Sequence, residues 1–166
     1  MKYCYECSEE LEEKYLEGEG MIPYCKKCGC FRFPIFSSAV SMVVHEPRER
    51  RILLIQQYGR TDNILVAGYI NKGECAEEAA AREVREETGL EITGLSFNRS
   101  EYFAKSNTLM INFACEVNSI DLSGVNGKEV DRAQWFSYED ALKYIKPGSL
   151  AKKFLEDFLR KQGIIR

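Results

Sequence analysis

Three glutamates lie close together in the segment REVREE, residues 82–87, within an alanine-rich stretch that predicts a helix. At about 100° per residue, Glu83, Glu86 and Glu87 share one face of that helix. Like charges four residues apart destabilise a helix, so this arrangement needs a partner that compensates the repulsion. Carboxylate oxygens are the ligands that Mg²⁺ prefers, and a divalent cation would supply the missing charge. The pattern indicates a cation site, and its alternative is an acid-rich, solvated helix face.

The cysteines indicate a second metal site. Four of the seven form two pairs with the spacing C-x2-C-x17-C-x2-C, namely Cys4, Cys7, Cys25 and Cys28. Each two-residue gap lets both sulfurs of a pair reach one tetrahedral zinc ion. Four cysteine ligands leave no position for water, so this Zn²⁺ would be structural and would hold together a segment too short to build a core. Cys30 could replace Cys28, and buried or disulfide-bonded cysteines are the alternative.

Composition and the remaining reactive side chains argue against several other classes of protein. The chain has 166 residues and a formal net charge of −3, which gives no general reason to expect affinity for nucleic acid or membranes. No apolar run reaches membrane-spanning length and the N-terminus lacks the apolar core of a signal peptide, so we expect a cytoplasmic protein. His45 is the single histidine and ends an expected strand, so we interpret it as structural. A glycine-rich phosphate loop of the Walker type is absent.

The segments that must position these side chains predict a mixed α/β sandwich. Residues 1–31 form the zinc-ribbon segment, with the charged stretch SEELEEKYLEGEG as an exposed connection, and residues 35–166 form the main domain. Within that domain, β-rich runs predict strands over residues 37–45, 51–57, 64–70, 95–105, 108–117 and 133–138. Helices are expected over residues 75–88, 139–145 and 149–163, the first of them stopped by a glycine.

One motif has the spacing of a known family. Residues 68–90, GYINKGECAEEAAAREVREETGL, match the whole Nudix box, G-x5-E-x7-R-E-U-x-E-E-x-G-U with U aliphatic. The chain therefore resembles a Nudix hydrolase, a family that cleaves nucleoside diphosphates linked to another moiety. The four-cysteine segment followed by Phe-Pro, and the later segments KEVDRAQWFSYEDA and PGSLAKKFLED, are similar to the NADH pyrophosphatase branch. The resemblance thus extends over nearly the whole chain.

The resemblance implies a fold and a set of metal ligands. The fold would be the Nudix mixed β-sheet in an α/β/α sandwich, preceded by a small zinc ribbon. The implied ligands for Mg²⁺ or Mn²⁺ are the backbone carbonyl of Ala67 and the side chains of Glu83, Glu86, Glu87 and Glu129. For Glu129, which lies outside the box, the alternative is an ordinary loop residue.

The resemblance also implies roles for the rest of the box. Arg82 would orient the catalytic glutamates, Glu74 would brace the loop and helix, and Gly68 and Gly89 complete the motif. A glutamate near the attacking water would be the general base, because proton transfer needs hydrogen-bond reach. The first choice is Glu86, and the alternatives are Glu129 and Glu74.

The segment after the box departs from the NADH-specific pattern. That branch carries S-Q-P-W-P-F-P-x-S, whereas residues 100–108 read SEYFAKSNT and contain neither the prolines nor the tryptophan. Because proline fixes φ, the loop is expected to have a different shape. Tyr102 or Phe103 could stack on a base, and the alternative is that they fill a core or a dimer interface. Ala151 matches a backbone position near the substrate, and the family suggests a homodimer.

Three functions are consistent with these residues. The leading one is hydrolysis of a small dinucleotide or nucleotide sugar such as NAD(H) or ADP-ribose, with release of a nucleoside monophosphate. The second applies the same chemistry to capped RNA or nucleoside triphosphates, and the third is a non-catalytic nucleotide sensor whose ribbon contacts a partner. The intact box glutamates disfavour the sensor. Residues 1–30 contain seven glutamates and four lysines, which disfavours a nucleic-acid partner for the ribbon.

Overall fold

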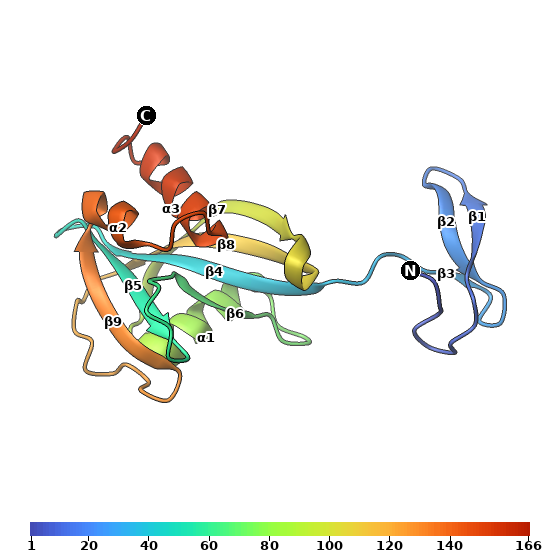
Figure 1. Ribbon diagram of the computed structural model, residues 1–166, viewed down its shortest axis with the longest axis horizontal. Coiled ribbons are helices and arrows are strands. Elements are labelled where there is room, and N and C mark those ends of the chain that lie inside the picture. The colour runs from blue at the N-terminus through green and yellow to red at the C-terminus, as the bar shows by residue number, and fades with distance from the viewer. The chain divides into compact units, whose positions relative to one another are not determined.

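The chain folds into two units, Met1–Phe36 and Ser37–Arg166 (Figure 1). The structure is a computed structural model that describes all residues from 1 to 166. Each unit has its own β-sheet, and the two are described separately below. No helix combines the length and the apolar character that crossing a lipid bilayer requires.

The N-terminal unit is a three-stranded antiparallel sheet in the order β1-β2-β3. Its strands are β1 (Glu12–Leu16), β2 (Gly20–Cys25) and β3 (Cys30–Phe31). The charged stretch that connects the two cysteine pairs contains β1 and the turn into β2, so this connection is a hairpin. Charged side chains suit such a strand, since β1 is an edge strand whose side chains are mostly exposed.

The main unit is built on a mixed six-stranded sheet in the order β7-β8-β4-β5-β9, with β6 paired to β4. Strands β4 and β8 run parallel, from the pair Ser37–Thr108 to the pair His45–Glu116, and all other pairs are antiparallel. The strands are β4 (Ser37–Glu46), β5 (Arg51–Gln57), β6 (Val66–Tyr69), β7 (Ile92–Phe103), β8 (Thr108–Val117) and β9 (Val130–Ser137). A short 3-10 helix, Ala104–Ser106, joins β7 to β8.

Helices cover both faces of this sheet (Figure 1). Helix α1 (Ala76–Thr88) lies on one face, while α2 (Tyr138–Tyr144) and α3 (Leu150–Lys161) lie on the other. Because alternate residues of a strand point to opposite faces, β4 supplies both cores. Its Met42 packs with the α1 side, whereas Val43 packs with α3, and both are fully buried. The expected α/β/α sandwich with a mixed sheet is confirmed.

Helix α1 begins and ends close to the predicted positions because its boundaries are set locally. At its start, the backbone N–H of Cys75 donates to the Glu78 carboxylate at 3.0 Å. At its end, Gly89 adopts a left-handed φ of 75°. A Cβ at Gly89 would lie 2.7 Å from the Cα of Gly124, so the close approach of the next loop also requires glycine here.

The strand predicted over residues 64–70 is shorter in the structure. Val66–Tyr69 pairs with β4, whereas Ile64 forms an isolated bridge to Ile55 of β5. The segment therefore changes partner between Ile64 and Val66, a change that its apolar sequence does not reveal.

Candidate active site

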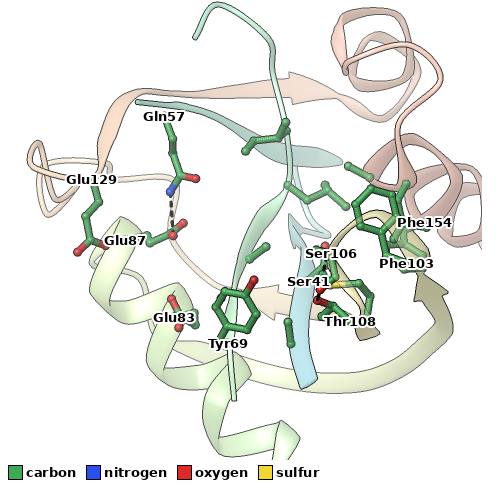
Figure 2. Close-up of a pocket in the computed structure, with 18 of the residues that line it drawn as sticks. Ser41, Gln57, Tyr69, Glu83, Glu87, Phe103, Ser106, Thr108, Glu129 and Phe154 are labelled. Carbon is green, nitrogen blue, oxygen red and sulfur yellow. Dashed lines mark hydrogen bonds between the residues drawn. The ribbon is translucent and has the colours of Figure 1, made fainter. Parts of the chain in front are cut away.

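The main unit contains a cavity of about 660 Å³. Its lining comes from strands β4, β5, β6 and β8 and the end of β7, from α1 and the start of α3, and from the loops around them. Figure 2 shows the carboxylates of Glu83, Glu87 and Glu129 on one side of this cavity and the rings of Phe103 and Phe154 on the other. The cavity thus has an acidic end and an apolar end.

Arg82 organises the acidic end. Its guanidinium holds Glu74 through two hydrogen bonds of 2.7 and 3.0 Å, and it also donates to Glu83 at 2.7 Å and to Glu86 at 3.1 Å. A fifth contact, 3.0 Å long, reaches the carbonyl of Tyr69 at the end of β6. The hydrogen bonds from Arg82 and from the backbone of Asn71 lower the pKa of Glu74 to about 2. These hydrogen bonds of Arg82 fix the loop before α1 to the helix α1 itself.

Gly68 brings β6 into close contact with the helix. A Cβ placed on Gly68 would lie 1.9 Å from the carboxyl carbon of Glu83, so a larger residue fits here only if the Glu83 carboxylate moves away. Gly68 is therefore needed for the close approach of β6 to α1. Gly89 is needed for the close approach of the Gly124 loop and also for the left-handed backbone that ends α1.

Glu87 is the most unusual carboxylate in the cavity. It is 3% exposed, and its Oε1 accepts a hydrogen bond of 2.8 Å from the side-chain amide of Gln57. Its Oε2 is buried and has no hydrogen-bond partner. Burial raises the pKa of Glu87 to about 7, the Gln57 hydrogen bond opposes this shift, and the negative charges of Glu83 and Glu129 reinforce it. A buried, incompletely satisfied carboxylate of this kind fits a cation ligand.

The structure brings most of the expected site residues to this cavity. Those that line it are Ala67, Gly68, Arg82, Glu83, Glu87, Phe103, Glu129 and Ala151. Glu129 is exposed and comes from the loop before β9, 42 residues after Glu87 in the chain. Two others lie just outside the lining: Glu74 is held by Arg82, and the Glu86 side chain is 51% exposed.

Tyr102 and Phe103 have different surroundings because they are consecutive residues of β7. Phe103 lines the apolar end of the cavity. Tyr102 does not line it, and its hydroxyl donates to the side chain of Asn107 at 2.6 Å. Of the two expected stacking residues, the geometry therefore supports Phe103.

Several lining residues have no signal in the sequence. They include Ser41, Gln57, Tyr58, Tyr69, Thr108 and Phe154. Tyr58 has a left-handed φ of 57°, which is uncommon for a bulky residue and places strain beside the cavity. By contrast, His45 lies away from the cavity, buried beside the rings of Tyr138 and Phe158, and its Nδ1 is 3.0 Å from the Tyr138 hydroxyl.

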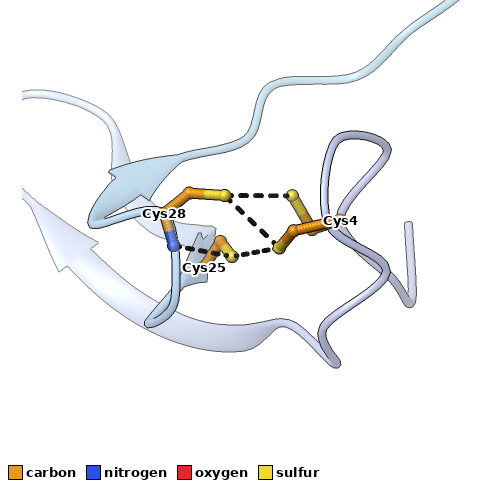
Figure 3. A group of neighbouring side chains, drawn as sticks. Cys4, Cys25 and Cys28 are labelled. Carbon is orange, nitrogen blue, oxygen red and sulfur yellow. Dashed lines mark hydrogen bonds between the residues drawn. The ribbon is translucent and has the colours of Figure 1, made fainter.

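The N-terminal unit holds the cysteine cluster, whose members Cys4, Cys25 and Cys28 are labelled in Figure 3. Together with Cys7, their sulfurs all lie within 4.8 Å of one another, whereas Cys30 is outside this group. The closest pairs are 3.3, 3.4 and 3.9 Å apart. Four ligands placed about 2.3 Å from a tetrahedral zinc ion are about 3.8 Å apart, so the cluster suggests a structural zinc.

Arg32 supports the cysteine cluster. Its Nε donates to the Cys4 sulfur at 3.2 Å, its guanidinium lies over the Tyr5 ring, and it forms an ion pair with Glu6. Its side chain is almost entirely buried in this unit. A fixed positive charge at this place would offset the negative charge of four thiolates around a divalent ion.

The chain belongs to the NUDIX domain family, since the model of that domain matches residues 36–158. Together with the carboxylate-lined cavity, this match defines a NUDIX domain with a candidate active site. Among curated proteins it is similar to the NAD-capped RNA hydrolase NudC of Escherichia coli O9:H4 (strain HS) and of Shigella boydii serotype 18 (strain CDC 3083-94 / BS512). Each is 28% identical over 158 residues, which is 94% of this chain. The chain spans 59% of the length of these relatives.

Two solved structures share the fold. Both are NUDIX hydrolases from Nitrosomonas europaea, with a TM-score of 0.64 and 21% identity to this chain. The first match covers 80% of this chain and 97% of that protein, and the second covers 98% and 94%. The predicted resemblance to the NADH pyrophosphatase branch is confirmed as a distant relationship to NudC.

Proposed function

We propose that this protein hydrolyses the diphosphate bond of a nucleoside diphosphate linked to another moiety, such as NAD(H) or ADP-ribose, and releases a nucleoside monophosphate. One observation carries the proposal: the buried Oε2 of Glu87 has no hydrogen-bond partner, and Glu87 lines the cavity together with Glu83 and Glu129. An exposed acidic surface would leave no carboxylate in that state, because water would satisfy it.

The donor set fits Mg²⁺ or Mn²⁺. Its members would be the carbonyl of Ala67 and the carboxylates of Glu83, Glu86, Glu87 and Glu129, all of them hard oxygen donors. When bound, such ions offset the charge of the diphosphate and lower the pKa of a coordinated water.

The residues of the chain orient the substrate and handle the proton. Arg82 holds the carboxylates of Glu74, Glu83 and Glu86 in place, which preorganises the acidic end. Among the three candidates for the general base, Glu74 and Glu86 are paired with Arg82, whereas Glu129 lines the cavity and forms no ion pair. A base must be free to accept a proton, so Glu129 is the best placed of the three if it acts as the base instead of as a metal ligand.

The apolar end suits a nucleobase. Phe103 can stack on an aromatic ring, and Ala151 at the start of α3 lines the same region. The cavity volume of about 660 Å³ falls within the range of small-molecule sites, so one nucleotide portion fits inside.

A second candidate substrate is the 5′ end of NAD-capped RNA, because the similar curated proteins carry that name. It contains the same diphosphate linkage, so the two substrates differ in what extends from the cavity. The acidic N-terminal unit favours the small molecule, since RNA binding depends on positive charge. We also propose that the cysteine cluster binds zinc and that the protein is a homodimer, as the family resemblance implies.

A substrate panel tests the proposal. The purified chain is incubated with Mn²⁺ or Mg²⁺ and with NADH, ADP-ribose, NAD-capped RNA or deoxynucleoside triphosphates, and products are separated by chromatography. We expect AMP from NADH or ADP-ribose and loss of turnover in Glu87→Gln. The matched control is Glu77→Gln, which makes the same change on an exposed part of α1. No turnover of any of these compounds by metal-loaded protein would exclude the enzyme and favour the nucleotide sensor.

A further inference from the structure

Gln57 lies at the cavity because side chains alternate along β5, where it follows Leu53 and Ile55 on the face that α1 covers. The pairing of β5 with β9 shifts register between Gln56 and Gln57, so that Gln56 faces Arg132 and Gln57 faces Val130. The extra residue of this shift lies on β9, so the alternation of side chains along β5 is unchanged. Gln56 donates to the Thr61 carbonyl and to the Asn63 side chain, whereas Gln57 lines the cavity and is 8% exposed.

The contact between Gln57 and Glu87 fixes one carboxylate oxygen and leaves the other without a partner. The Gln57 amide donates to Oε1 of Glu87 at 2.8 Å, as the dashed line in Figure 2 shows, while Oε2 has no partner. The terminal torsion of a glutamate is otherwise soft, so a carboxylate held at one oxygen loses most of its rotational freedom.

Gln57 also differs in charge from the other residue that holds the acidic end. Arg82 is a cation, and it partly neutralises Glu74, Glu83 and Glu86 through ion pairs. Gln57 is neutral, so it orients Glu87 without placing a positive charge beside that carboxylate. A charged donor in its place would compete with a bound cation for the same oxygens.

We propose that Gln57 is a positioning residue for the divalent-metal site: it holds Oε1 of Glu87 so that Oε2 is presented, still charged, to the cation. This inference rests on the proposed function, because it requires that Glu87 binds a metal ion. It goes beyond the Nudix box, since Gln57 lies on β5, outside residues 68–90.

The test measures metal affinity apart from catalysis. Mn²⁺ is titrated into the full chain, and free Mn²⁺ is followed by electron paramagnetic resonance. Gln57→Leu keeps a side chain of similar size and removes the donor, and we expect Mn²⁺ binding to weaken about 10- to 100-fold. Gln57→Lys keeps a donor but adds a charge, and we expect a loss at least as large. Gln56→Leu is the matched control, and its Mn²⁺ affinity should equal that of the wild type.

The two kinds of substitution separate positioning from packing. If Gln57 only fills space, Gln57→Leu would bind Mn²⁺ as the wild type does. A loss smaller than about fivefold in Gln57→Leu overturns the inference, because outer contacts that orient a metal ligand contribute more than this. Thermal unfolding in EDTA identifies any variant that does not fold. If Gln57→Leu is one of them, Gln57→His replaces it, because this variant restores a neutral N–H donor. The Mn²⁺ affinity of Gln57→His is then expected to recover to that of the wild type.

A double-substitution cycle tests whether Gln57 acts through Glu87. In a Glu87→Gln background, Gln57→Leu should cause no further loss of Mn²⁺ affinity. An equal loss in both backgrounds contradicts the inference and leaves the proposed function intact. If the wild type and Glu87→Gln bind Mn²⁺ equally, the metal site itself is wrong, and the proposed function fails with it.

Discussion

Replacing Glu87 by glutamine should separate the stability of this protein from its activity. Burial, reinforced by neighbouring carboxylates, raises the pKa of Glu87 from its ordinary value of 4.5 to about 7. A difference of this size corresponds to about 3 kcal/mol, by which the ionised carboxylate destabilises the folded, metal-free state. The glutamine keeps a carbonyl oxygen for the Gln57 amide and removes the charge.

The pH dependence follows from the direction of the shift. Because the folded state holds the Glu87 proton more tightly than the unfolded state, this group stabilises the fold fully below pH 4.5. The stabilisation is lost as pH rises through about 7, and roughly 2.5 kcal/mol of it disappears between pH 5 and pH 8. Other titrating groups, such as the buried His45, contribute equally to both proteins and cancel in the comparison.

Urea unfolding in EDTA measures the effect. The free energy of unfolding is determined at pH 5 and pH 8 for the wild type and for Glu87→Gln, and the change between the two pH values is compared. We expect the wild type to lose about 2 to 3 kcal/mol more than the variant over this range. Addition of Mn²⁺ at pH 8 should restore stability to the wild type by binding the folded state, and should do so much less in the variant.

An equal pH dependence in the two proteins would refute this reasoning, because it would mean that Glu87 is solvated and titrates normally. A larger loss of stability in the variant than in the wild type on going to pH 8 would contradict even the sign. The turnover assay is a separate readout, in which Glu87→Gln should be inactive although it folds.

The close approach at β6 and the cysteine cluster give two further predictions. Gly68→Ala should displace the Glu83 carboxylate, since the new Cβ would lie 1.9 Å from its carboxyl carbon, and kcat should fall at least tenfold. The control Gly127→Ala has open space around it and should stay active. Equal activity in both variants would show that Glu83 can move freely. Cys28→Ser should lower the zinc content measured by mass spectrometry and destabilise the N-terminal unit. Cys30→Ser should retain one zinc per chain, because only Cys28 belongs to the cluster. The reverse result would make Cys30 the fourth ligand.

The elements of the fold were predictable where their signals are local. Strands β5 and β8 coincide with the predicted ranges 51–57 and 108–117, and α1 begins one residue after its predicted start. The predictions failed where pairing partners decide the outcome. Ile64 bridges to β5 although its sequence continues into β6.

The candidate site, like the fold, was predictable from the sequence only where its signals are local. The sequence alone determined that Glu83, Glu86 and Glu87 share a helical face and that two cysteine pairs have ligand spacing, because helix periodicity and short gaps act within a few residues. It could not show which carboxylate is buried. Glu87 is enclosed and Glu86 is half exposed, although they are neighbours in one motif.

Only the tertiary structure decided which distant residues meet these carboxylates. Gln57 reaches Glu87 from β5, which lies in the sheet that α1 covers, and Glu129 reaches the same cavity from a loop. On β7, strand alternation directs Phe103, and not Tyr102, to the apolar end. Each of these placements depends on which strands pair and in what register, and pairing between segments far apart in the chain is settled by the packing of the whole unit. The sequence therefore determined the candidate metal ligands, and the fold determined which residues contact them.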